Sequence, residues 1–373
     1  MTPKTILLVS SAFYPEISPR SFRATELAKE FSRKGHKVFV LTKYRDYDYS
    51  EFLKEFPLTL KIWRRSLSPV IPEVTAKPFS SVRRALKRVL SLLFEFPDIE
   101  ETFRVRKILI GVTGYDLVIS FAVPFPVHWG VAWARSERNP IGKIWVADCG
   151  DPYMFARLDS FKKPFYFKFL EVYFCRKCDF LSVPFSEMQN QFYPEFRTKI
   201  RVIPQGFNIK EIVLCNTKPV NEKPVFIFTG SIIPGKRDLS LFLNFISSLS
   251  LDYLFIVYTV QKSWFNQYRT AMGERLELND YIDRLSLIYE MSKADFLVNV
   301  DTALDNQFNV EAVPSKLIDY ALTGRPILNI NSAKLDKELV LEFLNKNYSR
   351  QRFVDVDRYD IRTVSEKFLN CID

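Results

Sequence analysis

The chain has 373 residues, of which 47% are hydrophobic, so it is long and apolar enough to build two separate cores. Its 21 prolines and 11 glycines form no low-complexity run, which excludes a disordered or fibrous class of protein. No uninterrupted apolar stretch of about 18 residues occurs, and the apolar run at 6–9 is too short for a signal peptide, so we expect a cytoplasmic protein.

The net charge of +10 is unevenly distributed. Residues 1–200 contain 32 Lys and Arg against 21 Asp and Glu, whereas residues 201–373 contain 21 against 22. We therefore expect the N-terminal half to meet an anionic partner, either a membrane surface or an acidic substrate. A nucleic-acid partner is not expected, because the chain contains no recognisable nucleic-acid-binding motif.

The five cysteines indicate reduced thiols, because their number is odd and they form no disulfide framework. Cys175 and Cys178 have the C-x2-C spacing of a zinc site. Such a site needs two further ligands, and both histidines are distant in the sequence. We predict that these two thiols pack inside the protein and that no metal is bound.

The first forty residues predict a parallel βαβ unit. A continuous apolar run at 6–10 is typical of a strand that is buried on both faces. Apolar residues at helical spacing follow in 22–33, Gly35 marks the helix end, and 36–42 is the next strand.

The same alternation of strands and helices continues to the end of the chain. It is interrupted by a polar stretch at 214–224, which we interpret as a linker. Two sets of alternating elements predict two doubly wound, Rossmann-like α/β domains that face a central cleft. The further predicted strands are 115–120, 143–148, 179–184 and 201–206 before the linker, and 225–230, 253–259, 294–300 and 325–330 after it.

The segment 80–94 predicts a basic amphipathic helix. Such a helix can lie on an anionic bilayer, and the alternative is an ordinary surface helix whose apolar stripe faces the core. The proposed membrane-contacting residues are Arg83, Arg84, Lys87 and Arg88.

Polar residues near the predicted strand 143–148 are candidates for acceptor chemistry. Asp148 and Asp151 follow buried strand residues, where a carboxylate is accessible from a cleft. We favour Asp151 as catalytic, because it lies in a Gly-Asp-Pro turn, and Asp148 as acceptor-binding. His128 is a further acceptor candidate, although a histidine among aromatic residues is also typical of a core.

A second group of candidates follows the first strand of the C-terminal half. The loop TGSIIPGKRD, 229–238, combines glycines that let backbone amides approach an anion with two adjacent cations, Lys236 and Arg237. An ordinary βα loop with solvated basic residues is the alternative. Later in the chain, Pro314-Ser315-Lys316 begins a short helix, so its backbone amides and ammonium form a second positive site.

Taken together, these features resemble the retaining glycosyltransferases of the GT-B fold, especially glycosyltransferase family 4. That family has a Glu, seven residues, a second Glu, and then a small residue, Gly, any residue and Pro. The corresponding residues here are Glu311, Asp319 and 323–326, TGRP. The opening segment 11–42, VIPQGF at 202–207, and residues 121–153 also resemble family segments, and the resemblance extends through nearly the whole chain.

The resemblance implies a nucleotide-sugar donor in the C-terminal domain and a saccharide or lipid-linked acceptor in the N-terminal domain. It implies that Glu311 is a catalytic residue that contacts the donor sugar, that Asp319 contacts the ribose, and that basic residues bind the diphosphate. The linker divides the chain into domains at 1–213 and 214–358, and the resemblance implies a C-terminal helix at 359–373 that returns to the first domain. The donor-binding residues are then Gly230, Ser231, Lys236, Arg237, Ser315, Lys316 and Asp319.

Three positions depart from the family pattern. Asp319 is one methylene shorter than the usual Glu, and Ser231 stands where a basic residue is common. Ile17-Ser18-Pro19 replaces paired glycines, so the N-terminal loop is expected to bind through side chains, with Arg20 as an acceptor candidate.

We therefore expect a glycosyltransferase of surface-polysaccharide synthesis, acting in the cytoplasm at the inner face of the membrane. No cofactor is expected, because the Asp-x-Asp pairs at 46–48 and 355–357 lie outside strand ends. The alternatives are a nucleotide-sugar epimerase of the same fold and a non-catalytic sugar-nucleotide-binding protein.

Overall fold

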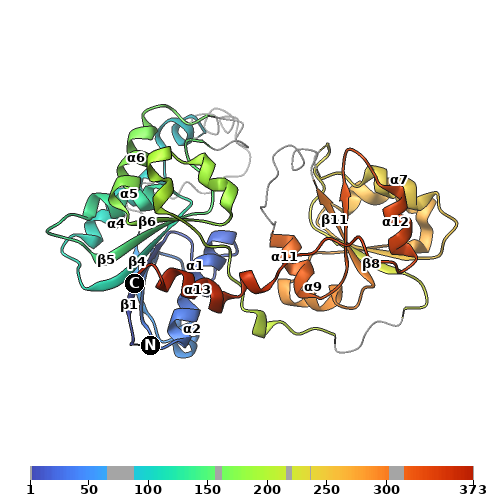
Figure 1. Cartoon of the computed structure of the whole chain (residues 1–373), viewed down its shortest axis with the longest axis horizontal. Coiled ribbons are helices and arrows are strands. Elements are labelled where there is room, and N and C mark those ends of the chain that lie inside the picture. The colour runs from blue at the N-terminus through green and yellow to red at the C-terminus, as the bar shows by residue number, and fades with distance from the viewer. Residues whose placement is uncertain are drawn as a thin grey trace. The chain divides into compact units, whose positions relative to one another are not determined.

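The computed structural model describes residues 2–64, 88–155, 162–215, 221–235, 237–301 and 315–372. The chain divides into two compact units, which are described separately (Figure 1). Unit 1 comprises Met1–Phe207 and Asp360–Asp373, and unit 2 comprises Asn208–Tyr359. The sequence placed these divisions after residues 213 and 358.

Unit 1 is built on a parallel sheet of seven strands in the order β3-β2-β1-β4-β5-β6-β7. The central strand β1 pairs with both neighbours, so that Ile6 lies opposite Val38 of β2 and Leu117 of β4. The strands are β1 (Thr5–Ser10), β2 (Lys37–Lys43), β3 (Thr59–Trp63), β4 (Tyr115–Ala122), β5 (Gly142–Cys149), β6 (Phe180–Val183) and β7 (Ile200–Val202).

Helices cover both faces of this sheet, because alternate residues of the buried strands point to opposite sides. Ile6 and Leu8 pack with α1, α2 and α13, whereas Leu7 and Val9 pack with α4, α5 and α6 (Figure 1). The helices are α1 (Pro19–Arg33), α2 (Ser50–Glu55), α4 (Ile99–Leu109), α5 (Pro126–Ala134), α6 (Phe167–Lys177) and α13 (Ile361–Leu369).

Unit 2 repeats this plan with a parallel sheet of five strands in the order β10-β9-β8-β11-β12. Its core is rich in aromatic rings, and Phe226 stacks on Phe296 with their centroids 4.8 Å apart. The elements are β8 (Val225–Thr229), α7 (Ser240–Ser247), β9 (Leu254–Tyr258), α8 (Asn266–Met272), β10 (Leu276–Asn279), α9 (Arg284–Met291), β11 (Phe296–Asp301), α11 (Ser315–Leu322), β12 (Ile327–Asn331) and α12 (Lys337–Leu344).

The predicted fold class of two doubly wound α/β sheets is confirmed. Every strand expected from an apolar run is present, although the one expected at 201–206 ends at Val202. The sequence missed β3 and β10, which lie at the sheet edges and have no continuous apolar run. Among the described helices, none has the length and hydrophobicity required to span a bilayer.

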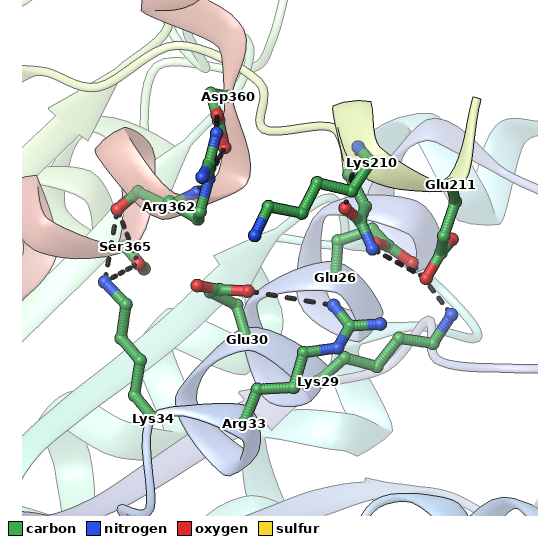
Figure 2. Close-up of polar contacts among 11 residues, drawn as sticks. Glu26, Lys29, Glu30, Arg33, Lys34, Lys210, Glu211, Asp360, Arg362 and Ser365 are labelled. Atoms are coloured by element: carbon green, nitrogen blue, oxygen red, sulfur yellow. Dashed lines mark hydrogen bonds and ion pairs between the residues drawn. The ribbon is translucent and has the colours of Figure 1, made fainter. Parts of the chain in front are cut away.

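The C-terminal helix α13 packs on α1 within unit 1. Its apolar residues Ile361, Val364 and Phe368 are buried in the same core as α1. At the helix surface, Lys34 Nζ donates to Ser365 Oγ at 2.8 Å and to the Arg362 carbonyl at 3.2 Å (Figure 2).

Each sheet has a switch point where the strand order reverses, between β1 and β4 in unit 1 and between β8 and β11 in unit 2. Ligands of open α/β sheets bind beyond the carboxyl ends of the strands at this point. In unit 2 the loop that begins at Gly230 leaves β8 here, so the fold places part of the predicted donor loop at the switch point.

Candidate active site

The loop after β8 has an unusual backbone that depends on glycine. Gly230 has φ +111 and donates its N–H to the Tyr258 carbonyl at 3.0 Å. A tight turn follows, in which Ile233 and Arg237 exchange backbone hydrogen bonds of 2.8 and 3.1 Å around Gly235 at φ +71. Only glycine adopts these left-handed conformations without strain.

The polar side chains of this loop face solvent. Ser231 and Arg237 are exposed. Asp238 holds the end of the loop, since its Oδ1 accepts from the Ser240 N–H at 2.8 Å. The predicted donor residue Lys236 lies outside the described residues.

Lys316, in the first turn of α11, lies against the same loop. A Cβ added at Gly230 would lie 3.8 Å from Lys316 Cδ, so the glycine leaves room for the lysine side chain. The ammonium lies 4.4 Å from the centroid of the Phe228 ring and 5.4 Å from that of the Tyr320 ring. Burial, together with repulsion from Arg237, lowers the pKa of Lys316 to about 7.

The anchoring of α11 explains how Lys316 is positioned. Tyr320 is fully buried, and its hydroxyl accepts from the Thr229 N–H at 2.9 Å, which joins α11 to the end of β8. Lys316 lies one turn before Tyr320 on the helix, and Gly230 directly follows Thr229. The fold thus brings Gly230, Arg237 and Lys316 together.

Asp319 forms a partly buried ion pair that the sequence did not predict. Its Oδ1 accepts from Arg284 Nε at 3.0 Å and from Arg284 Nη2 at 2.6 Å. Burial raises the pKa of Asp319, and Arg284 opposes this shift. Arg284 was missed because it lies 35 residues away, at the start of α9.

A polar network at the carboxyl ends of β11 and β12 was also missed. Asn299 donates to Asn329 Oδ1 at 2.6 Å, and both amides donate to Asp301 at 3.0 and 2.5 Å. Arg352 adds an ion pair of 3.1 Å to Asp301. The sequence signal that could have predicted this network is the presence of polar residues within two neighbouring, otherwise apolar strands.

Two predicted residues near α11 have little or no structural description. Glu311, the predicted catalytic residue, lies outside the described residues. Ser315 begins α11, and only its backbone is described. Their predicted roles remain predictions.

In unit 1, the structure brings Arg20 and Asp151 together as an ion pair. A Cβ added at Gly150 would lie 1.5 Å from Arg20 Nη1, so any side chain at this position would displace the guanidinium from its present place. Asp151 is 64% exposed, which leaves its carboxylate accessible. Arg20 is held by α1, whose N-terminus is capped by Ser18 Oγ and continues with Pro19.

Asp148 is buried, and this position corrects the prediction that it binds an acceptor. It accepts from Arg23 Nε at 2.6 Å, from Arg23 Nη2 at 2.7 Å and from Ser182 Oγ at 2.5 Å. Arg23 also donates to the Ile203 and Pro204 carbonyls at 2.9 and 2.6 Å. With 1% exposure and both oxygens bonded, Asp148 joins α1, β5 and β6 and has no surface for an acceptor.

His128 is also a core residue, which corrects the prediction that it binds an acceptor. It has no exposed surface, and its Nδ1 lies 2.7 Å from Ser120 Oγ. Ser120 Oγ in turn accepts from Trp145 Nε1 at 2.8 Å. Burial lowers the pKa of His128 to about 4, so the ring is neutral near pH 7.

Both thiols of the C-x2-C pair and the second half of the predicted basic helix lie among the described residues. Cys175 and Cys178 are buried, as predicted. Residues 88–94 are helical and Arg88 is exposed, whereas Arg83, Arg84 and Lys87 lie outside the described residues.

Comparison with known proteins identifies the fold. No protein-family model and no curated protein sequence matches the chain. Among solved structures, a glycosyltransferase from Rickettsia africae ESF-5 is 11% identical, with a TM-score of 0.59 over 99% of this chain and 94% of that chain.

Two further structures are similar over almost their whole length. The lipopolysaccharide outer core galactosyltransferase WaaB is 12% identical, with a TM-score of 0.58 over 99% of both chains. The Anabaena protein HepE in complex with UDP is 11% identical, with a TM-score of 0.57 over 98% of both chains. The chain therefore has the GT-B fold of these proteins.

A UDP-N-acetylglucosamine 2-epimerase also has this fold. It is 11% identical, with a TM-score of 0.54 over 99% of this chain and 95% of that chain. The fold alone therefore does not distinguish transfer from epimerisation.

Proposed function

We propose that the protein is a glycosyltransferase that moves a sugar from a UDP- or GDP-sugar to a saccharide or lipid-linked acceptor. The observation that carries the proposal is the position of Lys316, whose side chain lies beside Gly230 at the switch point of unit 2 with its ammonium over the Phe228 ring. A partly buried cation without a carboxylate ion-pair partner among the described residues fits the diphosphate of a nucleotide sugar.

The proposed mechanism follows from the charge that develops on the leaving group. When the glycosidic bond breaks, the nucleoside diphosphate gains negative charge, and cations fixed beside it stabilise the transition state more than the ground state. Lys316 and Arg237, with Lys236, supply this charge, and the amides of Ser231 and Ser315 add hydrogen bonds. The Gly230 N–H is already bonded to the Tyr258 carbonyl, so Gly230 contributes by leaving room for the Lys316 side chain. Asp319, oriented by Arg284, is proposed to accept from a ribose hydroxyl.

The remaining roles extend the proposal to the sugar and the acceptor. Glu311 is proposed to contact the donor sugar, and transfer is proposed to retain the anomeric configuration, as in glycosyltransferase family 4. On the acceptor side, the exposed Asp151 is proposed to orient or deprotonate the attacking hydroxyl while Arg20 fixes the carboxylate. No metal cofactor is proposed.

The proposed setting is surface-polysaccharide synthesis at the inner face of the cell membrane. The excess of Lys and Arg in residues 1–200 supports peripheral contact with an anionic bilayer. The basic residues of segment 80–94 are proposed to contribute to that contact.

The donor site is tested by thermal unfolding with UDP, GDP and their sugars. We expect one nucleotide to stabilise the protein, and Lys316→Ala to remove that stabilisation. Lys334→Ala is the matched control, because Lys334 is an exposed lysine elsewhere in unit 2. If no nucleotide stabilises the protein, or if Lys316→Ala responds like the wild type, the donor site is wrong.

Turnover then separates the alternatives. Release of nucleotide that requires a saccharide or lipid-linked acceptor supports transfer. Inversion at C2 of a UDP-N-acetyl sugar without an acceptor identifies the epimerase, which the similar epimerase structure makes the second candidate. Stabilisation without either reaction identifies a non-catalytic binding protein.

A further inference from the structure

Helix α6 of unit 1 presents aromatic rings to solvent. Phe165 is 78% exposed and Phe169 is 69% exposed, while Tyr166 and Tyr173 are each 37% exposed. The N–H of Lys168 donates to the Phe165 carbonyl at 3.1 Å, so a helical turn extends α6 back to Phe165. Since Phe165, Phe169 and Tyr173 are four residues apart, they lie on one side of the helix. We call these four residues the α6 aromatic face.

The opposite side of α6 already fills the core of unit 1. Phe167, Phe174 and Cys175 belong to the same buried cluster as the rings of α5. A helix on the surface of a soluble protein normally exposes polar residues opposite its buried stripe. The exposed rings of α6 are therefore not explained by packing within this unit.

The apolar surface continues onto the helical residues 88–94. The Tyr166 hydroxyl donates to the Leu93 carbonyl, and Lys163 forms an ion pair with Glu95, so the two segments are in contact. Phe94 is 56% exposed and Leu93 is 37% exposed. Contiguous apolar patches of this kind mark surfaces that bind a partner.

The exposed charged residues of α6 and of the segment just before it are positive. Lys162, Lys168 and Arg176 are exposed. From residue 162 to residue 178 the only acidic residue is Glu171, which is fully buried. Exposed rings beside lysines, with no exposed carboxylate between residues 162 and 178, complement an anionic bilayer: rings favour the headgroup region and cations attract lipid phosphates.

We propose that the α6 aromatic face, with Leu93 and Phe94, docks onto an anionic lipid bilayer, and that Phe165 and Phe169 insert into it. The inference rests on the membrane contact in the proposed function and assigns it to a surface that does not depend on Arg83, Arg84 or Lys87. The enzyme would then encounter a lipid-linked acceptor in the same bilayer onto which it docks.

Vesicle sedimentation tests this surface without any donor or acceptor. We expect the wild-type protein to bind vesicles that contain phosphatidylglycerol, and a Phe165→Ser/Phe169→Ser variant to bind them about tenfold more weakly, because two inserted rings are lost. Phe353→Ser is the matched control, since Phe353 is 84% exposed in unit 2 and is expected to leave binding unchanged.

A charge variant provides a second measurement should the serine variant fold poorly. Lys162→Glu/Lys168→Glu is expected to weaken binding to phosphatidylglycerol vesicles and to leave any binding to pure phosphatidylcholine vesicles unchanged. Nucleotide-dependent stabilisation measured on the same variants should equal that of the wild type, so failure of the docking surface and failure of the donor site give different results.

Three outcomes would overturn the inference. The wild-type protein does not bind phosphatidylglycerol vesicles, or both double variants bind as the wild type does. Alternatively, the serine variant turns a dimer into a monomer while vesicle binding is unchanged, which assigns the face to a second copy of the chain.

Discussion

The ammonium of Lys316 lies near two aromatic rings and the Arg237 guanidinium. Burial and the guanidinium favour the neutral amine when no anion is bound, and Asp301 opposes this shift. Because burial and Arg237 lower its pKa to about 7, the fraction of protein with a charged Lys316 falls as the pH rises above that value. A bound diphosphate favours the charged form, so binding of the donor is coupled to uptake of a proton.

This coupling predicts that the affinity for a UDP-sugar decreases as the pH rises from 6 to 9. Above the pKa of Lys316 the loss approaches about tenfold per pH unit. A UDP-sugar is the suitable probe, because its diphosphate has no proton that titrates in this range. Calorimetric titration at several pH values gives the slope.

Lys316→Arg is the control for this slope, because a guanidinium stays protonated throughout the range. We expect the variant to bind with little dependence on pH. A wild-type affinity that is constant from pH 6 to 9 would show that Lys316 does not meet the diphosphate.

The buried His128 predicts sensitivity to acid. Its pKa is about 4 in the folded protein against 6.5 for an unperturbed histidine. Below pH 6.5 the unfolded chain binds a proton that the folded protein excludes, so stability decreases as the pH falls toward 4. Between pH 7 and pH 5 this group lowers the free energy of unfolding by about 2 kcal/mol.

Urea unfolding of the wild type and of His128→Asn at pH 7 and pH 5 measures this effect. The variant should be less stable at pH 7 but should lose less stability on acidification. His36, whose pKa is also lowered by burial, is present in both proteins and cancels in the comparison. An equal loss in both proteins would rule out the role of His128.

At the scale of elements, α13 is predicted to stabilise unit 1 through its apolar face. Phe368 is fully buried against the core that includes α1. Truncating a buried Phe costs about 3–5 kcal/mol, and we expect this loss for Phe368→Ala in urea unfolding. Lys34→Ala removes the contacts with Ser365 and with the Arg362 carbonyl shown in Figure 2, and it should cost less than about 1 kcal/mol. Equal costs would contradict apolar docking.

The sequence predicts those elements whose signal is local. Continuous apolar runs such as 6–10 and 225–230 identified buried strands, and the order of strands and helices identified the fold class. The edge strands β3 and β10 were missed, because TLKIW and LELN lack such runs. An edge strand forms through pairing with a neighbour, and that neighbour is fixed by the tertiary fold.

The site residues show the same limit. Spacing after a strand identified Gly230, and the start of a helix identified Lys316. The sequence could not show that Asp148 accepts hydrogen bonds from Arg23, which lies 125 residues away, or that Arg284 forms an ion pair with Asp319. The exposure of Phe165 and Phe169 was not predicted, because composition does not show which side of a helix faces solvent.

At the scale of the whole molecule, the two units have separate cores. The clusters around β1 contain only residues of unit 1, and the cluster around Phe226 contains only residues of unit 2. The described part of the proposed diphosphate site, with Lys316, belongs to unit 2 alone. Ligand binding stabilises the folded state of the part that binds it.

We therefore predict two transitions in calorimetric unfolding, of which the stabilising nucleotide raises the one that belongs to unit 2. At a hundredfold excess over its dissociation constant the ligand adds about 2.7 kcal/mol to the stability of that unit. Two buried rings identify the transitions: Phe368→Ala should lower the transition of unit 1, and Phe343→Ala that of unit 2. A nucleotide-dependent shift confined to the transition lowered by Phe368→Ala would contradict the assignment of the diphosphate to Lys316, because that residue lies in the other unit.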